Sequence, residues 1–351
     1  MNVTFMIGNG FDLNLGLETS YEKFIDEYRS NNLNDSDEIR AFKERMEKDL
    51  KNWSDVEQAL GKCTKDFTGD KAGDAFFECY NDIYDKLADY LEREEQKVDN
   101  CSDEMIREGM KHALTNWQRG FRTARNSEIQ NRINQIGGGY RYNFIIFNYT
   151  KTVDRCIKTI RNTKLLGART VSNNSYENTI SRQVHVHGYT DKDMILAVND
   201  ESQIANMDVF ADRLIYDSHR LIKNKANKLF EEGTDDLAYE LLKTSDLIYI
   251  YGMSLGETDK LWWQRIGEVL DTHKNTQVIY YSFKAPKDER HYMDFLKHEN
   301  RIRGKLATYF EEDFYDIDNM LTRIHVVKYN VFEKLSNIAL EMLPQSIKAI
   351  S

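Results

Sequence analysis

The chain has 351 residues, of which 40% are apolar, 12% aromatic and 30% charged. That is enough for one large packed domain or two ordinary ones. Its formal net charge of -10 argues against a general surface for nucleic acid or anionic membranes. It has no apolar run of membrane-spanning length, and its first apolar run follows no basic segment of the signal-peptide kind. We therefore expect a cytoplasmic protein that contacts no membrane.

The cysteines predict neither disulfides nor a zinc site. They form no Cys-x-x-Cys pair and have no zinc-ligand spacing with histidine. Since a chain of this size can build its core without disulfides, we expect reduced thiols and no bound metal. The four cysteines are Cys63, Cys79, Cys101 and Cys156.

The first stretch predicts a strand, a glycine turn and a helix. The apolar run Val3–Ile7 has strand length, Gly8 and Gly10 follow it, and Thr19–Glu22 has the Thr-x-x-Glu pattern of a capping box. Such a turn can bind phosphate, because glycines allow close approach and free N–H groups face the anion. Leu13 stands where the dinucleotide fingerprint needs a third glycine, so a plain tight turn is the alternative.

The rest of the chain divides into a helical block and a region where strands and helices alternate. Residues 31–136 are polar, with apolar side chains at helical spacing, and predict four or five helices. Beyond Gly137–Gly139 the expected strands are Tyr142–Phe147, Leu165–Val171, Gln183–Val186, Met194–Val198, Asp246–Tyr251, Thr276–Tyr281 and Ile324–Val327. The expected helices are Asp208–Leu242, Thr258–Leu270 and most of the chain beyond Pro286.

Buried strands that alternate with helices predict an α/β fold, a doubly wound Rossmann-like parallel sheet with an all-helical insertion. We expect residues 1–30 and 137–285 to form a nucleotide-binding core. Residues 31–136 would be the helical insertion, and 286–351 a mainly helical C-terminal segment that packs on the core.

Small or polar residues directly follow four of the expected strands. These turns are Gly8–Asp12, Asn148–Asp154, His187–Gly188 and Gly252–Asp259. Ligands bind at the carboxyl ends of parallel strands, so the four turns together favour a binding site over plain loops.

The turns also carry a family resemblance. The segments Ile7–Leu17, Phe147–Thr150, His185–Gly188 and Tyr251–Asp259 resemble the AbiH family of bacteriophage abortive-infection proteins. The resemblance runs from residue 5 to about residue 285. It implies a role in anti-phage defence.

A more distant resemblance is to the sirtuin-like NAD-binding fold. Gly8-x-Gly10 and Gly16 fall at the spacing of the sirtuin glycine loop, and His187-Gly188 matches the sirtuin His-Gly. Asn148 matches the sirtuin asparagine, and Gly252–Leu255 matches Gly-Thr-Ser-Leu. The zinc-binding cysteine pairs are missing, which argues against protein deacylation and leaves NAD binding or cleavage.

Asp154 lies too far from Asn148 to stand in register as the sirtuin aspartate. The resemblance implies that Asn148 and His187 are catalytic residues hydrolysing NAD to nicotinamide and ADP-ribose. Asn148 would hold a ribose hydroxyl and orient water, and His187 would accept a proton. The implied NAD-binding residues are Gly8, Asn9, Gly10, Phe11, Asp12, Gly252, Ser254, Leu255 and Asp259.

Other interpretations remain open at this point. Asn148 could simply turn the chain, and one of the alternating histidines His185 and His187 should be a packing residue. The whole pocket could bind ADP-ribose or NAD as a non-catalytic sensor. A nuclease is the least favoured, because no acidic metal cluster or basic stripe is visible. Beyond the nucleotide, the candidate partners are a second copy of the chain or a defence protein; we expect no nucleic acid.

Overall fold

The computed structural model describes residues 1–31, 35–48, 50, 53, 55–161, 166–310 and 316–342. Its contacts divide the chain into two compact units. The first comprises Met1–Gly16, Val98–His185 and Asp236–Ser351, and the second comprises Leu17–Lys97 and Val186–Asp235. Among the described residues, no helix combines the length and apolar character that crossing a membrane requires.

The first unit is built on a six-stranded sheet in which every neighbouring pair is parallel. The strands lie in the order β5-β2-β1-β6-β7-β8, so β1 separates two sets of later strands. Their bounds are β1 Asn2–Ile7, β2 Arg141–Ile146, β5 Thr179–His185, β6 Leu247–Tyr251, β7 Gln277–Tyr281 and β8 Ile324–Val327.

The central strands are buried on both faces, which is why their sequences are continuous apolar runs and not alternating patterns. All five residues of β6 are buried. The Phe5 ring stacks between the rings of Phe144, at 5.6 Å, and Tyr249, at 5.2 Å. The register sets Ile7 beside Ile146 and Tyr251, so the turns that follow these strands begin at one level.

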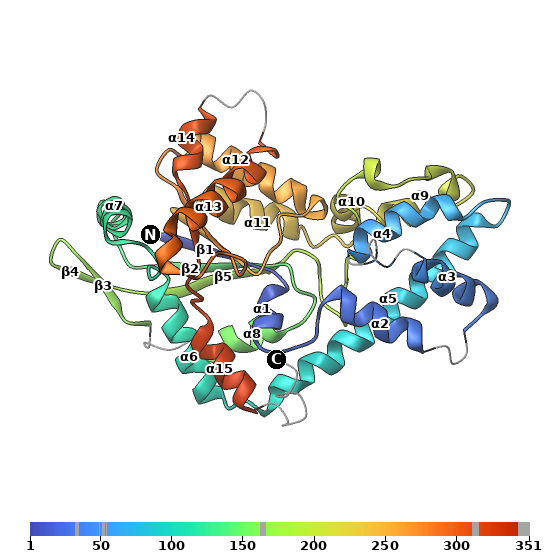
Figure 1. The fold of residues 1–351 in the computed structure, drawn as a ribbon, viewed down its shortest axis with the longest axis horizontal. Helices are drawn as coiled ribbons and strands as arrows, with labels where there is room; N and C mark the ends of the chain where they lie inside the picture. The colour runs from blue at the N-terminus through green and yellow to red at the C-terminus, as the bar shows by residue number, and fades with distance from the viewer. Residues whose placement is uncertain are drawn as a thin grey trace. The chain divides into compact units, whose positions relative to one another are not determined.

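Helices flank the sheet, with α11, α12 and α13 on one side and α1, α6, α8 and α15 on the other (Figure 1). The helices of this unit are α1 Gly10–Asn14, α6 Asp103–Asn116, α7 Thr123–Asn134, α8 Thr152–Lys158, α12 Lys260–Thr272, α13 Tyr292–Ala307, α14 Ile317–Thr322 and α15 Glu333–Met342, with most of α11 Thr234–Lys243. A separate antiparallel hairpin pairs β3 (Ala168–Val171) with β4 (Asn174–Glu177).

The second unit is mainly helical. Its helices are α2 Tyr21–Ser30, α3 Asp37–Glu47, α4 Val56–Cys63, α5 Ala72–Gln96, α9 Ile215–Arg220 and α10 Lys223–Leu229. Buried aromatic rings join them, with Phe76 in edge contact with Phe67 and Phe210 at 5.4 and 5.8 Å. A buried ion pair between Lys223 and Glu57, 2.8 Å long, links α10 to α4.

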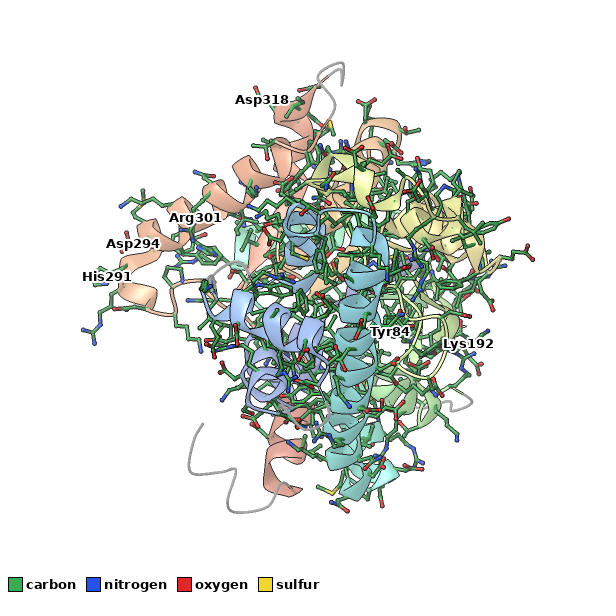
Figure 2. The ribbon with its side chains drawn as sticks, turned by 90° about the vertical axis from the view of Figure 1, so that its right-hand side faces the viewer. Tyr84, Lys192, His291, Asp294, Arg301 and Asp318 are labelled. Carbon is green, nitrogen blue, oxygen red and sulfur yellow. The ribbon has the colours of Figure 1, made fainter. Side chains whose placement is uncertain are left out.

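The predicted α/β class with a parallel sheet is confirmed, and β8 has the predicted bounds. The strand predicted at Met194–Val198 is wrong, because only Val198 forms an isolated bridge. Side chains satisfy this extended backbone instead: the hydroxyls of Tyr80 and Tyr84 donate to the carbonyls of Leu196 and Met194, each at 3.1 Å. Figure 2 labels Tyr84 on α5.

Two further local predictions are corrected. The expected helix Asp208–Leu242 is divided into α9, α10 and α11, because Ile222 is extended and Gly233 has a φ of 60°. The cap of α2 is Ser20, which accepts from the N–H of Lys23, and not Thr19 of the predicted capping box.

Part of the Leu165–Val171 prediction is an antiparallel hairpin strand, and Leu165 lies outside the described residues. Residues 311–315 and 343–351 of the predicted C-terminal segment also lie outside them. The two contact-based units divide the chain at other points than the predicted insertion: residues 98–136 fall with the sheet and 17–30 with the second unit. The predicted boundaries at 30, 136 and 285 stay predictions.

Candidate functional site

The turns after β1 and β6 meet backbone to backbone. The Gly8 N–H donates to the Tyr251 carbonyl at 2.9 Å, and the Gly10 N–H donates to the Gly252 carbonyl at 2.8 Å. A Cβ on Gly10 would lie 2.5 Å from the Gly252 Cα, and one on Gly252 would lie 2.7 Å from the Phe11 nitrogen. Gly252 also has a φ of 70°. Only glycines allow this approach.

This close approach of the two turns explains why glycine is needed at Gly8 and Gly10, and the explanation requires no bound ligand. The N–H of Phe11 donates to the Gly8 carbonyl at 2.9 Å, so the amides of Gly8, Gly10 and Phe11 all serve the protein's own backbone. Asn9, at the tip of the turn, is exposed. A nucleotide at this turn would have to use groups other than these three amides, and the predicted contacts of the turn with NAD stay a prediction.

Asp12 lies beneath the turn and joins it to the segment after β2. Its side chain is 1% exposed and accepts from the Thr150 hydroxyl at 2.6 Å and from the Thr152 hydroxyl. Burial raises the pKa of Asp12 above its ordinary value, against the opposing effect of these hydroxyls, the Asn148 amide and His185. We interpret Asp12 as the residue that holds the 148–152 segment, and its predicted contact with NAD stays a prediction.

Asn148 follows β2 and is 4% exposed. Its side-chain amide lies close enough to the Asp12 carboxylate to favour the charged form of Asp12. Neither its Nδ2 nor its Oδ1 meets regular hydrogen-bond geometry with any described residue. A buried amide without partners is costly, so it needs an explanation. A ligand that bonds both atoms is one.

His185, the last residue of β5, extends the cluster. Its Nε2 lies 2.7 Å from Asp154 Oδ2, and its Nδ1 lies 3.2 Å from the Asn148 carbonyl oxygen. The Gln183 amide donates to Asp154, and Arg161 donates to Gln183 at 3.0 Å. Both ring nitrogens therefore face acceptors, and His185 positions the Asn148 backbone from the neighbouring strand.

Two tyrosine hydroxyl groups donate hydrogen bonds to the backbone of the loop after β6. The Tyr280 hydroxyl donates to the Met253 carbonyl at 2.8 Å, and the Tyr309 hydroxyl donates to the Leu255 carbonyl at 3.1 Å. Ser254 between them is exposed, and Asp259 is half-buried just before α12. The loop thus presents Ser254 at the carboxyl end of β6 from a fixed backbone, while its predicted contact with the cofactor stays a prediction.

His187 belongs to the second unit, whereas Asn148 belongs to the first. His187 is 4% exposed, and its carbonyl accepts from the Ile195 N–H of the same unit at 2.9 Å. Gly188 has a φ of 70°, and a Cβ there would lie 1.9 Å from the Asp193 oxygen. Gly188 is therefore required for this loop, and the catalytic role of His187 stays a prediction.

Sequence reasoning missed the residues that complete the cluster of the first unit. Thr150 and Thr152 were visible as hydroxyls in the turn after β2, and Asp154 was weighed only for its sirtuin register. The sequence analysis assigned the catalytic role to His187, whereas it is His185 that contacts Asn148. The signal that could have found them is the excess of polar side chains between Asn148 and Asp154.

The sequence of the chain matches a known protein family. A family model described as bacteriophage abortive infection AbiH matches residues 4–281. The chain belongs to the AbiH family. The matched range contains the glycine junction and the whole cluster from Asp12 to His185, and the family indicates a role in abortive infection of phage. The resemblance expected from the turns is thus confirmed, whereas no curated protein matches the sequence.

Proposed function

We propose that this AbiH protein is an NAD glycohydrolase that acts in abortive infection. The observation that carries the proposal is the Asn148 side chain, a buried amide whose two polar atoms lack regular hydrogen-bond partners among the described residues. It stands at the carboxyl end of β2, where parallel sheets bind their ligands.

The strand order supports a nucleotide ligand. Numbered as they occur along the chain, the parallel strands lie in the order 3-2-1-4-5-6, which is the order of doubly wound dinucleotide-binding sheets. In that fold the ligand lies where the order reverses, which here is between β1 and β6. The glycine junction occupies this point, and Ser254 and Asn148 follow the strands on either side of β1. The Rossmann-like and sirtuin-like interpretations rest on this order and on the turns.

The chemistry of NAD cleavage suits an amide. Nicotinamide is cationic in NAD and leaves as a neutral molecule, through a transition state that resembles an oxocarbenium ion. Little acid catalysis is needed, so position matters most. Asn148 supplies a donor and an acceptor, one for a ribose hydroxyl and one for the attacking water. Asp12 holds Thr150 and Thr152 of the same segment, His185 contacts the Asn148 carbonyl oxygen, and His187 is the proposed proton acceptor.

The direct test is nicotinamide release from NAD by the purified protein, alone and with phage lysate, followed by chromatography. The wild-type chain is expected to release nicotinamide, and Asn148→Ala to lower the rate about 100-fold or more, since the amide positions the reacting groups. His187→Ala is measured alongside it. The matched control is Asn174→Ala on the exposed strand β4, which should keep the wild-type rate.

No release of nicotinamide under any condition, or a wild-type rate of release with Asn148→Ala, would contradict the proposal.

A specific observation also supports the alternative of a non-catalytic sensor. Asp12, Asp154 and His185 all hydrogen-bond to protein groups, which suits binding of a ligand without chemistry. Calorimetry with ADP-ribose separates the two. Tight binding that Asn148→Ala weakens, with NAD recovered intact, establishes the sensor.

A further inference from the structure

Three consecutive apolar side chains are exposed on the second unit. The exposed fractions of Leu214, Ile215 and Tyr216 are 71%, 65% and 59%. Leu214 caps α9, and the other two residues begin that helix. Single exposed apolar residues are common on proteins, but adjacent ones that form a patch with a polar rim mark interaction sites. These three side chains form the 214–216 surface.

The backbone beneath the 214–216 surface is fixed by hydrogen bonds. The Asp217 N–H donates to the Leu214 carbonyl at 2.9 Å, and the Ser218 hydroxyl donates to the Ile215 carbonyl at 2.9 Å. Arg213, on the preceding side, donates through Nε to Asp217 at 2.7 Å. The apolar side chains are therefore presented from an ordered segment, which lowers the entropic cost of binding a partner.

A pocket of about 330 Å³ adjoins this surface, and Leu214 forms part of its wall. The other walls are the start of α5 with the residues just before it, and residues between 208 and 217. These walls are in close contact, since a Cβ on Gly73 would lie 2.6 Å from the Val209 carbonyl oxygen. The apolar surface and the pocket are thus continuous, and the pocket is large enough to receive a long side chain.

The pocket is strongly acidic. Arg213 is the cation among its described lining residues, and it pairs with Asp74 and with Asp217. One guanidinium therefore serves two carboxylates. Five aspartates and one arginine give the lining a formal net charge of -4, and the aspartates are Asp70, Asp74, Asp208, Asp212 and Asp217.

Three of these carboxylates are not compensated by a cation. Asp70, Asp208 and Asp212 are exposed, and none of them forms an ion pair with a residue that the structure describes. Charges of one sign inside a concave surface reinforce one another, so the pocket concentrates negative potential beside the 214–216 surface. A molecule that covers both must therefore carry positive charge next to an apolar group.

This charge decides between the candidate occupants. An anionic membrane and a nucleic acid are both repelled by a charge of -4. A second copy of the chain that presents the same surface would bring two acidic pockets together, which is unfavourable for like charges. A protein segment with an apolar face and basic side chains suits both parts of the surface, and an amphipathic helix is the usual form of such a segment.

We propose that the 214–216 surface and its pocket dock a basic amphipathic helix of a partner protein. Apolar side chains of the helix cover the 214–216 surface, and a lysine or arginine enters the pocket toward Asp208 and Asp212. The apolar contacts supply most of the affinity, whereas the aspartates raise the association rate and select basic partners. The whole surface lies in the second unit, and its docking does not depend on NAD cleavage at Asn148.

The test is calorimetric titration of the full chain with a 14-residue peptide of leucine and lysine whose order gives an amphipathic helix. The control peptide has the same composition in an order that gives no apolar face. The amphipathic peptide should bind about tenfold or more tightly than the control peptide, because only it can cover the apolar surface. Raising the salt concentration to about 0.5 M should weaken its binding, since exposed charges are screened.

Two double variants separate the apolar part of the surface from the charged part. Leu214→Ser/Ile215→Ser should weaken binding of the amphipathic peptide about tenfold or more. Leu214 is the N-cap of α9, where serine is favoured, so this variant should fold. Asp208→Asn/Asp212→Asn should weaken binding about fivefold at low salt but little at about 0.5 M.

The matched control for the charged part is Asp85→Asn/Asp89→Asn, which removes the same charge from exposed positions of α5. Asp85 stands eleven residues after Asp74 on that helix, roughly 16 Å away at a rise of about 1.5 Å per residue. This control should bind the peptide as the wild type does. Equal weakening by the control means a general attraction to an acidic protein, and it overturns the inference.

Other results also overturn it. One is an amphipathic peptide that binds no more tightly than the control peptide, and another is wild-type binding by Leu214→Ser/Ile215→Ser. Sedimentation of the wild type as a dimer that the serine variant abolishes identifies a second copy of the chain as the occupant. Binding to phosphatidylserine vesicles that the serine variant abolishes identifies a membrane instead.

Discussion

At the scale of single residues, the site depends on a carboxylate that the protein buries. Asp12 is 1% exposed, and two threonine hydroxyls bond it. The arrangement joins the turn after β1 to the turn after β2, and it keeps a titratable group away from water. Because a buried charge is unfavourable, the stability of the fold should depend on the protonation of this one group.

The change Asp12→Asn tests this dependence. The pKa of the folded Asp12 is raised, so between its ordinary value of 3.8 and the folded value the folded state binds more protons than the unfolded state. Acidification in that window favours folding. The wild type should therefore gain stability relative to Asp12→Asn as the pH falls through this window toward 3.8. The gain should be up to about 1.4 kcal/mol for each pH unit by which the folded pKa exceeds the ordinary one.

Urea unfolding of both proteins across this pH range measures the difference. Asp236→Asn, at an exposed position on α11, is the control for the loss of one surface carboxylate. A difference between wild type and Asp12→Asn that is constant, or that grows in favour of the wild type as the pH rises, contradicts the prediction.

Residue roles were only partly predictable from the sequence. Asn148 could be found because a polar residue directly follows an apolar strand. The partners of Asp12 could not, since Thr150 and Thr152 are 138 and 140 positions away in the chain. The choice between His185 and His187 likewise depends on which strand each histidine faces, and strand neighbours are set by sheet order.

At the scale of elements, the junction of β1 and β6 brings two turns of the first unit into close backbone contact. Its glycines permit two backbone hydrogen bonds between the turns, at 2.8 and 2.9 Å. The sequence predicted a glycine turn here but favoured a phosphate cradle, because free N–H groups cannot be distinguished from bonded ones before the partner strand is known. Buried strands were easier to predict, since their apolar runs are continuous.

Replacing Gly252 tests the junction. Gly252→Ala requires an alanine at a φ of 70° and a Cβ 2.7 Å from the Phe11 nitrogen. Backbone strain and overpacking should together lower the free energy of unfolding by about 2 to 5 kcal/mol. The control is Gly304→Ala on α13, where nothing lies within 4 Å of the added Cβ. There alanine should stabilise the helix by up to about 1 kcal/mol. Denaturant titration of both variants gives the comparison, and a neutral Gly252→Ala would show that the junction does not constrain the fold.

At the scale of the whole molecule, each unit is assembled from segments that are distant in sequence. The first unit combines three segments and the second combines two. Composition and periodicity revealed the helical block but could not assign its later part to the sheet. The helices α6 and α7 belong with the sheet because of tertiary packing, which local patterns do not contain.

The defence role of the AbiH family and the proposed reaction at Asn148 can be tested together in whole cells. The AbiH match covers the polar cluster, and the proposal assigns its defence role to NAD cleavage at Asn148. The most direct measurement is the NAD content of phage-infected cells that express wild type or Asn148→Ala at equal levels, with Asn174→Ala as control. The account predicts a fall in NAD after infection with wild type and the control, and none with Asn148→Ala. Protection against phage with NAD unchanged, or an equal fall in NAD with Asn148→Ala, would contradict it.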